Sequence, residues 1–205
     1  MSYPHWDYFL TLEVDLINLA RYIEFSEKNF DTFSIELVRI LLAASSEVDV
    51  VAKVLCQQID PDFLSRIKSG KRNPSINDYK ETILSKRPGV VNFRVELPRY
   101  GLTLLPWISW DKDGENPDWW KAYNSVKHER NNNFHQANLR NALNSVAGLF
   151  GLVLNLYSHE NSNRELYPEP RLFKSRLFKS QVMTYLGVQE EARTRPGSGV
   201  GLTFD

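Results

Sequence analysis

The chain has 205 residues, of which 42% are hydrophobic and 24% charged, and its formal net charge at pH 7 is zero. This length is enough for one sizeable hydrophobic core, so we expect a single domain. Because no net charge attracts nucleic acid, an interaction with RNA requires a local cluster of basic residues. Cys56 is the only cysteine, which excludes an internal disulfide and a cysteine-based structural zinc site and fits a reducing compartment.

Apolar residues at three- and four-residue steps predict two helices in the first part of the chain. The first ends near Lys28, and the second is a long helix over residues 33–59. Residues 62–87 predict two shorter helices, because glycine and proline interrupt the pattern between them.

The hydrophobic period changes after residue 88. Hydrophobic and polar side chains alternate over residues 91–97, and residues 100–110 are rich in aromatic residues that favour strands. Two prolines restrict both runs to edge positions. This pattern predicts a small β-hairpin, inserted at about 88–112 into a helical body.

The helical period returns at Asn116 and Pro117, which are typical of a helix start, and we expect this helix to reach residue 129. Three asparagines at 131–133 are poor helix formers and predict a kink or a new start.

The last long helix, over residues 139–157, repeats the apolar spacing of the 33–59 helix. We expect the two to pack lengthwise, with Gly148 and Gly151 permitting close approach of the backbones. The predicted fold class is therefore mainly α, an antiparallel helical bundle with a small β-hairpin-like insertion.

The chain becomes polar after Ser158. A tandem repeat, RLFKS, over residues 171–180 predicts one short amphipathic helix, and residues 189–205 have the composition of a loose tail. We therefore divide the chain into a helical domain, 1–160, and a C-terminal extension, 161–205, that is partly disordered.

Three charged residues interrupt the apolar pattern of the 33–59 helix. Asp49 and Lys53 are one turn apart, which favours an ion pair, and Glu47 is expected to be solvated. In the alternative interpretation, one of these acids lies beside His135.

The residues best suited to chemistry are Arg130, Asn131 and His135. An arginine can hold a phosphate, and a histidine can transfer a proton near neutral pH. On a continuous helix, side chains five residues apart would diverge by about 140°, so a break at the asparagines is needed to bring the arginine beside the histidine. The competing interpretation is structural, with His135 hydrogen-bonded in the core and Arg130 in a salt bridge at a helix end.

Basic residues gather around this motif. Residues 119–143 are locally basic although the chain as a whole has no net charge, and the basic residues of this cluster are Lys121, Lys127, Arg130 and Arg140. This is the local patch on which RNA binding would depend.

Arg130, the polar residue directly after it and His135 resemble the R-x4-6-H signature of the HEPN superfamily, because they stand where a late long helix begins in a helical chain. The resemblance covers mainly residues 33–59 and 117–157. It implies a homodimeric helical bundle that acts as a metal-independent endoribonuclease, a hydrolase, in toxin–antitoxin or antiviral defence systems. Some members of the superfamily are inactive and serve as binding or dimerisation modules, which is the alternative function.

The resemblance also implies roles for the motif. Arg130 and His135 of two protomers would face each other, and a ribose 2′-hydroxyl would attack the neighbouring phosphate. His135 would be the general acid/base and Arg130 would hold the phosphorane oxygens. We expect Asn131 to orient the histidine or the substrate.

Four neighbouring residues are expected to bind substrate. Lys127 and His128 would extend the anion-binding surface, and Trp120 and Tyr123 would stack on bases. The alternative for the two aromatics is burial, because their helix must bury one face.

The expected partners are RNA, a second copy of the chain and an antitoxin or defence-system protein. His128 and His135 are seven residues apart, which is not the zinc-protease spacing, so we expect no metal and no cofactor. The first ten residues lack a secretory signal and no apolar run has the length of a membrane span, so we expect a cytoplasmic protein without a membrane partner.

Overall fold

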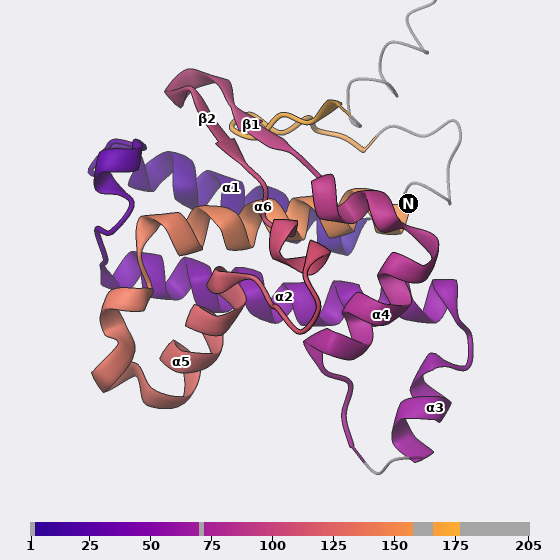
Figure 1. Cartoon of the computed structure of the whole chain (residues 1–205). Coiled ribbons are helices and arrows are strands. Elements are labelled where there is room, and N and C mark those ends of the chain that lie inside the picture. Colours follow the sequence, from indigo (N-terminus) through magenta and orange to yellow (C-terminus); the bar gives the residue numbers. More distant parts are fainter. Residues whose placement is uncertain (1–2, 70–71, 158–165, 177–205) are drawn as a thin grey trace, which may run out of the picture.

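A computed structural model of the chain describes residues 3–69, 72–157 and 166–176. Within these ranges the fold is mainly helical with one two-stranded antiparallel sheet, which confirms the predicted fold class (Figure 1). The α-helices and strands are α1 Pro4–Leu19, α2 Ile35–Ile59, α3 Phe63–Ser69, α4 Ile76–Lys86, β1 Val95–Leu97, β2 Leu102–Leu104, α5 Asp118–Asn133 and α6 Leu139–Tyr157. Short 3-10 turns lie between them: η1 Glu27–Asn29, η2 Pro88–Asn92, η3 Pro98–Tyr100, η4 Ile108–Asp111 and η5 Phe134–Gln136. None of the helices in the described ranges combines the length and the hydropathy that crossing a membrane requires.

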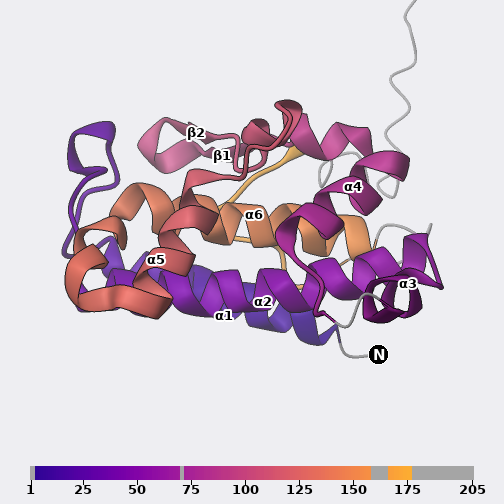
Figure 2. The ribbon, with the colours of Figure 1, turned by 60° about the horizontal axis from the view of Figure 1, so that its bottom comes forward.

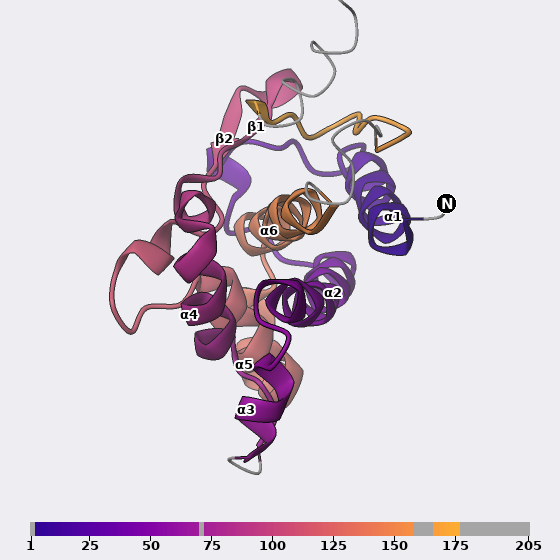
Figure 3. The same ribbon diagram turned by 90° about the vertical axis from the view of Figure 1, so that its right-hand side faces the viewer.

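Helix α6 is the centre of the fold. Seen end-on, it lies between α1, α2 and the hairpin, and it also contacts α5 (Figure 3). Fourteen of its 19 residues are buried, as expected for a helix that is apolar on nearly every side. Its most extensive contact is with α2, so the predicted lengthwise packing is confirmed. The two helices start side by side, since the amides of Leu139 and Arg140 donate to the carbonyls of Thr32 and Phe30 just before α2.

The first helix is shorter than predicted. It ends at Leu19 and not near Lys28, although Ile23 continues its apolar spacing. The chain turns because Phe25 is buried and packs against Tyr100, with ring centroids 5.0 Å apart. A helix that ran on to Lys28 would not make the turn that brings Phe25 to the hairpin.

The hairpin is present but has only three residues in each strand. Val95 pairs with Leu104 and Leu97 with Leu102, and Gly101, with a φ of 64°, closes the turn in the left-handed region. The rest of the predicted strands forms the 3-10 turns η2 and η4. These turns bury apolar side chains against the helices, and Trp110 in η4 is an example.

Gly148 and Gly151 do permit a close approach, but the partners are aromatic rings and not the backbone of α2 as predicted. A Cβ atom on Gly151 would lie 2.6 Å from Cδ1 of Phe93, and one on Gly148 would lie 3.0 Å from Cζ2 of Trp119. The Gly148 carbonyl also accepts a hydrogen bond of 3.2 Å from Nε1 of Trp107. The glycines therefore make room for the insertion and for α5.

The first RLFKS copy is not helical, contrary to our prediction. Lys174 forms an antiparallel bridge with Glu96 of β1, with N to O distances of 2.8 Å in both directions. Phe173 is fully buried beside Phe9 and Phe150. The described residues up to 176 therefore share one core across the expected boundary at 160; the second copy beyond Arg176, and residues 189–205, lie outside the described part.

Glu13 of α1 explains why the first copy is extended. One carboxyl oxygen accepts the backbone amides of Leu172 (2.7 Å) and Phe173 (3.0 Å), and the other accepts that of Arg171 (2.9 Å). The indole of Trp6 adds a hydrogen bond of 3.2 Å to the Pro168 carbonyl. These contacts hold residues 168–173 across α1.

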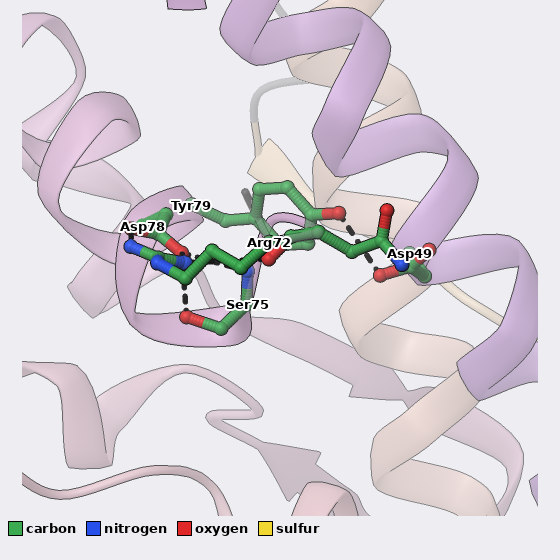
Figure 4. Close-up of polar contacts among 6 residues, drawn as sticks. Asp49, Arg72, Ser75, Asp78 and Tyr79 are labelled. Atoms are coloured by element: carbon green, nitrogen blue, oxygen red, sulfur yellow. Dashed lines mark hydrogen bonds and ion pairs between the residues drawn. The ribbon is translucent and has the colours of Figure 1, made fainter. Parts of the chain in front are cut away.

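Helix α4 begins with a side-chain cap. Asp78 accepts the Ser75 amide at 2.7 Å and its hydroxyl at 2.6 Å, and Arg72 binds both carboxylate oxygens of Asp78 at 2.6 Å (Figure 4). The next residue, Tyr79, donates its hydroxyl to Asp49 of α2 at 3.0 Å, so the start of α4 is tied to the central helices.

The charged residues of α2 follow the prediction in part. The Asp49–Lys53 ion pair is confirmed, at 3.4 Å. The prediction that Glu47 is solvated is wrong, because its carboxylate lies 2.6 Å from Nδ1 of His5 in α1. The histidine that pairs with an acidic residue of α2 is therefore His5 and not His135.

Candidate functional site

Helix α5 is broken near its end, as the asparagine run predicted. The break is at Glu129, whose φ of −136° and ψ of 53° are not helical, and so it precedes the asparagines. Asn133 secures it, since its side-chain amide reaches back to the carbonyls of Glu129 (3.0 Å) and Ser125 (3.5 Å). The helix itself begins at Asp118, one residue later than expected.

The segment after the break is held by further amide contacts. Gln136 donates to Oδ1 of Asn133 at 2.8 Å, and Asn141 donates to the Gln136 carbonyl at 2.8 Å. These bonds connect the end of α5 to the first turn of α6 and enclose η5, which contains His135. A local polar network therefore fixes the backbone around the motif.

Arg130 and His135 are both exposed at the surface. Among the described residues, neither side chain has a hydrogen-bond or ion-pair partner. The competing structural interpretation is therefore wrong: His135 is not a core histidine and Arg130 is not in a helix-end salt bridge. Both groups are free to meet a ligand or a second chain.

Two open pockets border the broken helix. The larger, of about 530 Å³, is lined by residues of α5 and by one residue of α2: Leu42, Val126, Lys127, His128, Glu129, Arg130, Asn131 and Asn132. The smaller, of about 370 Å³, is more apolar and is lined by Ile35, Val38, Arg130, Asn131 and Phe134. Arg130 and Asn131 therefore lie between the two pockets and contribute to both.

His135 lines neither of these two pockets. No hydrogen bond or ion pair within the described residues joins it to Arg130. Within one chain, the histidine that shares a pocket with Arg130 is His128. Sequence reasoning had assigned His128 only to a wider anion-binding surface.

The other basic residues of the cluster are engaged with protein groups. Lys121 pairs with Asp118 at 3.1 Å, and Arg140 stacks over the Phe30 ring with 4.7 Å from Cζ to the centroid. Lys127 donates to the hydroxyl of Tyr123 at 3.2 Å. In the described part of the cluster, Arg130 alone has a cationic group without a protein partner, and it is the best placed to bind an anion.

The two aromatics expected to stack on bases are largely covered. Trp120 and Tyr123 are each only 7% exposed, and they pack against each other with centroids 5.2 Å apart. Trp119 beside them is buried and donates its indole N–H to the Pro106 carbonyl at 2.8 Å. Base stacking on Trp120 or Tyr123 stays a prediction, and their burial favours a structural role.

Sequence reasoning missed the apolar wall that α2 contributes to the site. Ile35, Val38 and Leu42 follow one another at three- and four-residue steps and line the two pockets. The sequence does contain a signal for this wall, because these positions form a second apolar stripe beside the main stripe of α2. Phe134 of η5 completes this wall and packs edge-on against Phe33, with centroids 5.4 Å apart.

The described residues contain no group of three or more histidine, cysteine, aspartate or glutamate side chains placed to hold a metal ion.

Comparison of the chain with models of protein families, with curated proteins and with solved structures gives no match. The fold and the site define a helical protein with an exposed arginine between two pockets at a broken helix.

Proposed function

We propose that this chain is a metal-independent endoribonuclease that acts as a homodimer, with Arg130 and His135 as its catalytic residues. The observation that carries the proposal is the position of Arg130, exposed and without a protein partner in the described part, on the border of two pockets. The resemblance of Arg130, Asn131 and His135 to the HEPN motif supplies the reaction class.

The proposed reaction is a transesterification within the RNA, in which the phosphoryl group passes from a 5′-oxygen to the neighbouring 2′-oxygen. The 2′-oxygen of a ribose attacks the adjacent phosphorus and gives up its proton to a base, and the bond from phosphorus to the 5′-oxygen breaks as that oxygen is protonated. The products are a 2′,3′-cyclic phosphate and a 5′-hydroxyl. Arg130 would stabilise the charge that develops on the phosphorane oxygens, His135 would transfer a proton, and Asn131 would orient the substrate beside them.

A second copy of the chain supplies His135 in this proposal, since the residue lies outside both pockets of Arg130 in its own chain. The surface beside Arg130 is suited to an interface. Ile35 is 77% exposed and Phe33 48% exposed, and Phe33 packs against Phe134, which lines the smaller pocket together with Ile35. Neighbouring exposed apolar side chains of this kind would be covered by a second copy of the chain.

The proposed setting is a cytoplasmic toxin or antiviral defence system, as the resemblance implies. In such a system an antitoxin or another defence-system protein would hold the nuclease inactive until it is needed. Expression of the chain alone would then be toxic, and expression of an Arg130→Ala variant would not.

The activity is tested by incubating the purified full chain with mixed RNAs in EDTA. We expect cleavage by the unaltered chain and a loss of about 100-fold or more in the Arg130→Ala and His135→Ala variants. Lys68→Ala is the matched control for charge, because Lys68 is an exposed lysine of α3, which lies at the opposite end of the bundle from α5 (Figures 1 and 2). Intact RNA with the unaltered chain, or undiminished cleavage by both variants with their circular dichroism retained, contradicts the proposal.

The shared site is tested by mixing the two inactive variants. If Arg130 of one protomer works with His135 of the other, a heterodimer of Arg130→Ala and His135→Ala contains one intact site. Random reassortment then restores about a quarter of the activity. No restoration, with heterodimers verified by mass spectrometry, excludes a site shared between protomers.

The second candidate function is a non-catalytic helical binding or dimerisation module. It is favoured by the absence, among the described residues, of a hydrogen bond or ion pair between Arg130 and His135. Such a module would bind RNA or a protein through Arg130 without cutting it. Salt-dependent RNA binding that Arg130→Ala weakens, together with intact RNA after incubation, distinguishes it from the nuclease.

A further inference from the structure

The larger pocket brings a second histidine together with the arginine. His128 and Arg130 both line it, and both are exposed. Within the described residues, the His128 side chain makes no hydrogen bond or ion pair. An imidazole and a guanidinium without protein partners therefore border the same open space of about 530 Å³.

The break in α5 makes this arrangement possible. On a regular helix two residues that are two positions apart point about 160° away from each other, so His128 and Arg130 would lie on nearly opposite faces. The residue between them, Glu129, has the non-helical φ and ψ that redirect the chain. Asn133 holds that break through its bond to the Glu129 carbonyl. The polar network around the break thus positions His128 and Arg130 on one pocket.

We propose that His128 is a catalytic residue for RNA cleavage, which takes the proton of the ribose 2′-hydroxyl while Arg130 holds the phosphate in the same pocket. This inference rests on the proposed nuclease function and adds a residue to that site. The reaction needs two proton transfers, one from the attacking 2′-oxygen and one to the departing 5′-oxygen. His128 performs the first in its neutral form, and His135 of the second protomer performs the other in its protonated form.

The other side chains that line the pocket are less suited than His128 to take the proton of the 2′-hydroxyl. Lys127 is bound to the Tyr123 hydroxyl, and Arg130 is a permanent cation. Glu129 is the only carboxylate among the lining residues, and its negative charge would repel the phosphate that the base must approach. The residue contributed by α2, Leu42, is apolar and carries no proton. Of the groups that line the pocket, the imidazole is the one whose ordinary titration range includes neutral pH.

The test measures steady-state cleavage of a short RNA in EDTA by the full chain, His128→Ala and the Lys68→Ala control. We expect His128→Ala to lower kcat by about 100-fold or more while KM changes by less than about threefold. Added imidazole restores part of the rate of His128→Ala, and the acidic limb of its pH–rate profile is lost. Lys68→Ala has the kcat of the unaltered chain.

Two results overturn the inference while leaving the nuclease intact. The first is an unchanged kcat in His128→Ala. The second is a rise in KM alone without rescue by imidazole, which makes His128 a phosphate-binding residue and not a base. Absence of cleavage by the unaltered chain overturns the proposed function, and this inference with it. His128→Gln, compared by thermal melting, separates loss of the imidazole from loss of the fold.

Discussion

Glu13 joins α1 to the C-terminal segment, and its removal should loosen the fold. Its side chain is 1% exposed and accepts three backbone amides, those of Arg171, Leu172 and Phe173. Glu13→Ala leaves all three amides without their acceptor. Each buried donor that loses its partner costs about 1–3 kcal/mol, and two of the three bonds are buried, so we expect a loss of about 2–6 kcal/mol.

Glu13→Gln is the sharper variant because it keeps the shape of the side chain. One oxygen can still accept the amides of Leu172 and Phe173, but the amide nitrogen then faces the Arg171 N–H, and two donors oppose each other. We expect a loss of about 1–3 kcal/mol from this single unsatisfied contact. Glu27→Gln is the control, since Glu27 is exposed in η1 and should change stability by less than about 0.5 kcal/mol.

The assay is urea unfolding at neutral pH, combined with hydrogen exchange of the backbone amides. Both Glu13 variants should lose protection at residues 171–173 first, because these are the amides that donate to the carboxyl group. A Glu13→Ala chain with the midpoint of the unaltered protein and full protection at residues 171–173 would show that these three hydrogen bonds do not hold the segment in place.

Three further predictions concern packing and charge. Gly151→Ala should lower stability by up to about 2 kcal/mol, because the overlap of the new methyl group with the Phe93 ring outweighs the gain in helix propensity. A Cβ atom on Gly89 would have nothing within 4 Å, so Gly89→Ala should be tolerated, and thermal melting of both variants checks the difference. Burial raises the pKa of Cys56 from 9.0 to about 12, so the unfolded chain loses the thiol proton first, and stability should fall as pH rises from about 9 towards 12. In urea unfolding, Cys56→Ala should make this slope smaller; an unchanged slope would contradict the prediction. Hydrogen bonds from Arg72 lower the pKa of the Asp78 carboxyl group, so Asp78→Asn should cost about 0.5–2 kcal/mol of stability at pH 7. The difference between the variant and the unaltered chain should shrink as pH falls below 3.8, and equal differences at pH 7 and pH 3 would contradict the prediction.

The apolar periodicity of the sequence predicted the two central helices well, because each buries apolar residues at every turn. The 3- and 4-residue spacing of α2 and α6 is continuous, and both helices were placed to within two residues of the bounds that the structure shows. The start of α1 has the same regularity, but its end does not follow from the spacing. Phe25 lies off the apolar stripe, and only its packing against Tyr100 shows that the chain must turn before it.

Contacts between distant parts of the chain were beyond the reach of sequence patterns. Glu13 is an acidic residue on an otherwise apolar stripe, and nothing local identifies the amides more than 150 residues away that it accepts. The first RLFKS copy has a helical composition, yet its amides are engaged by Glu13 and by β1. Tertiary hydrogen bonds override the local preference there.

The site was predicted in part for a similar reason. The asparagine run correctly predicted a break in α5, because asparagine side chains compete for backbone hydrogen bonds. Its position at Glu129 depends on the reach of Asn133 to a carbonyl four residues earlier. The spacing of His128 and Arg130 places them on nearly opposite faces of a regular helix, so their common pocket could be found only from the structure.

The proposed nuclease cuts RNA without a metal at the surface around Arg130. The most direct measurement is the chemistry of the RNA ends after incubation in EDTA, read by mass spectrometry. We expect 2′,3′-cyclic phosphates and 5′-hydroxyls that disappear with Arg130→Ala. Intact RNA, or 5′-phosphate ends that form only when a divalent metal is restored, would contradict it.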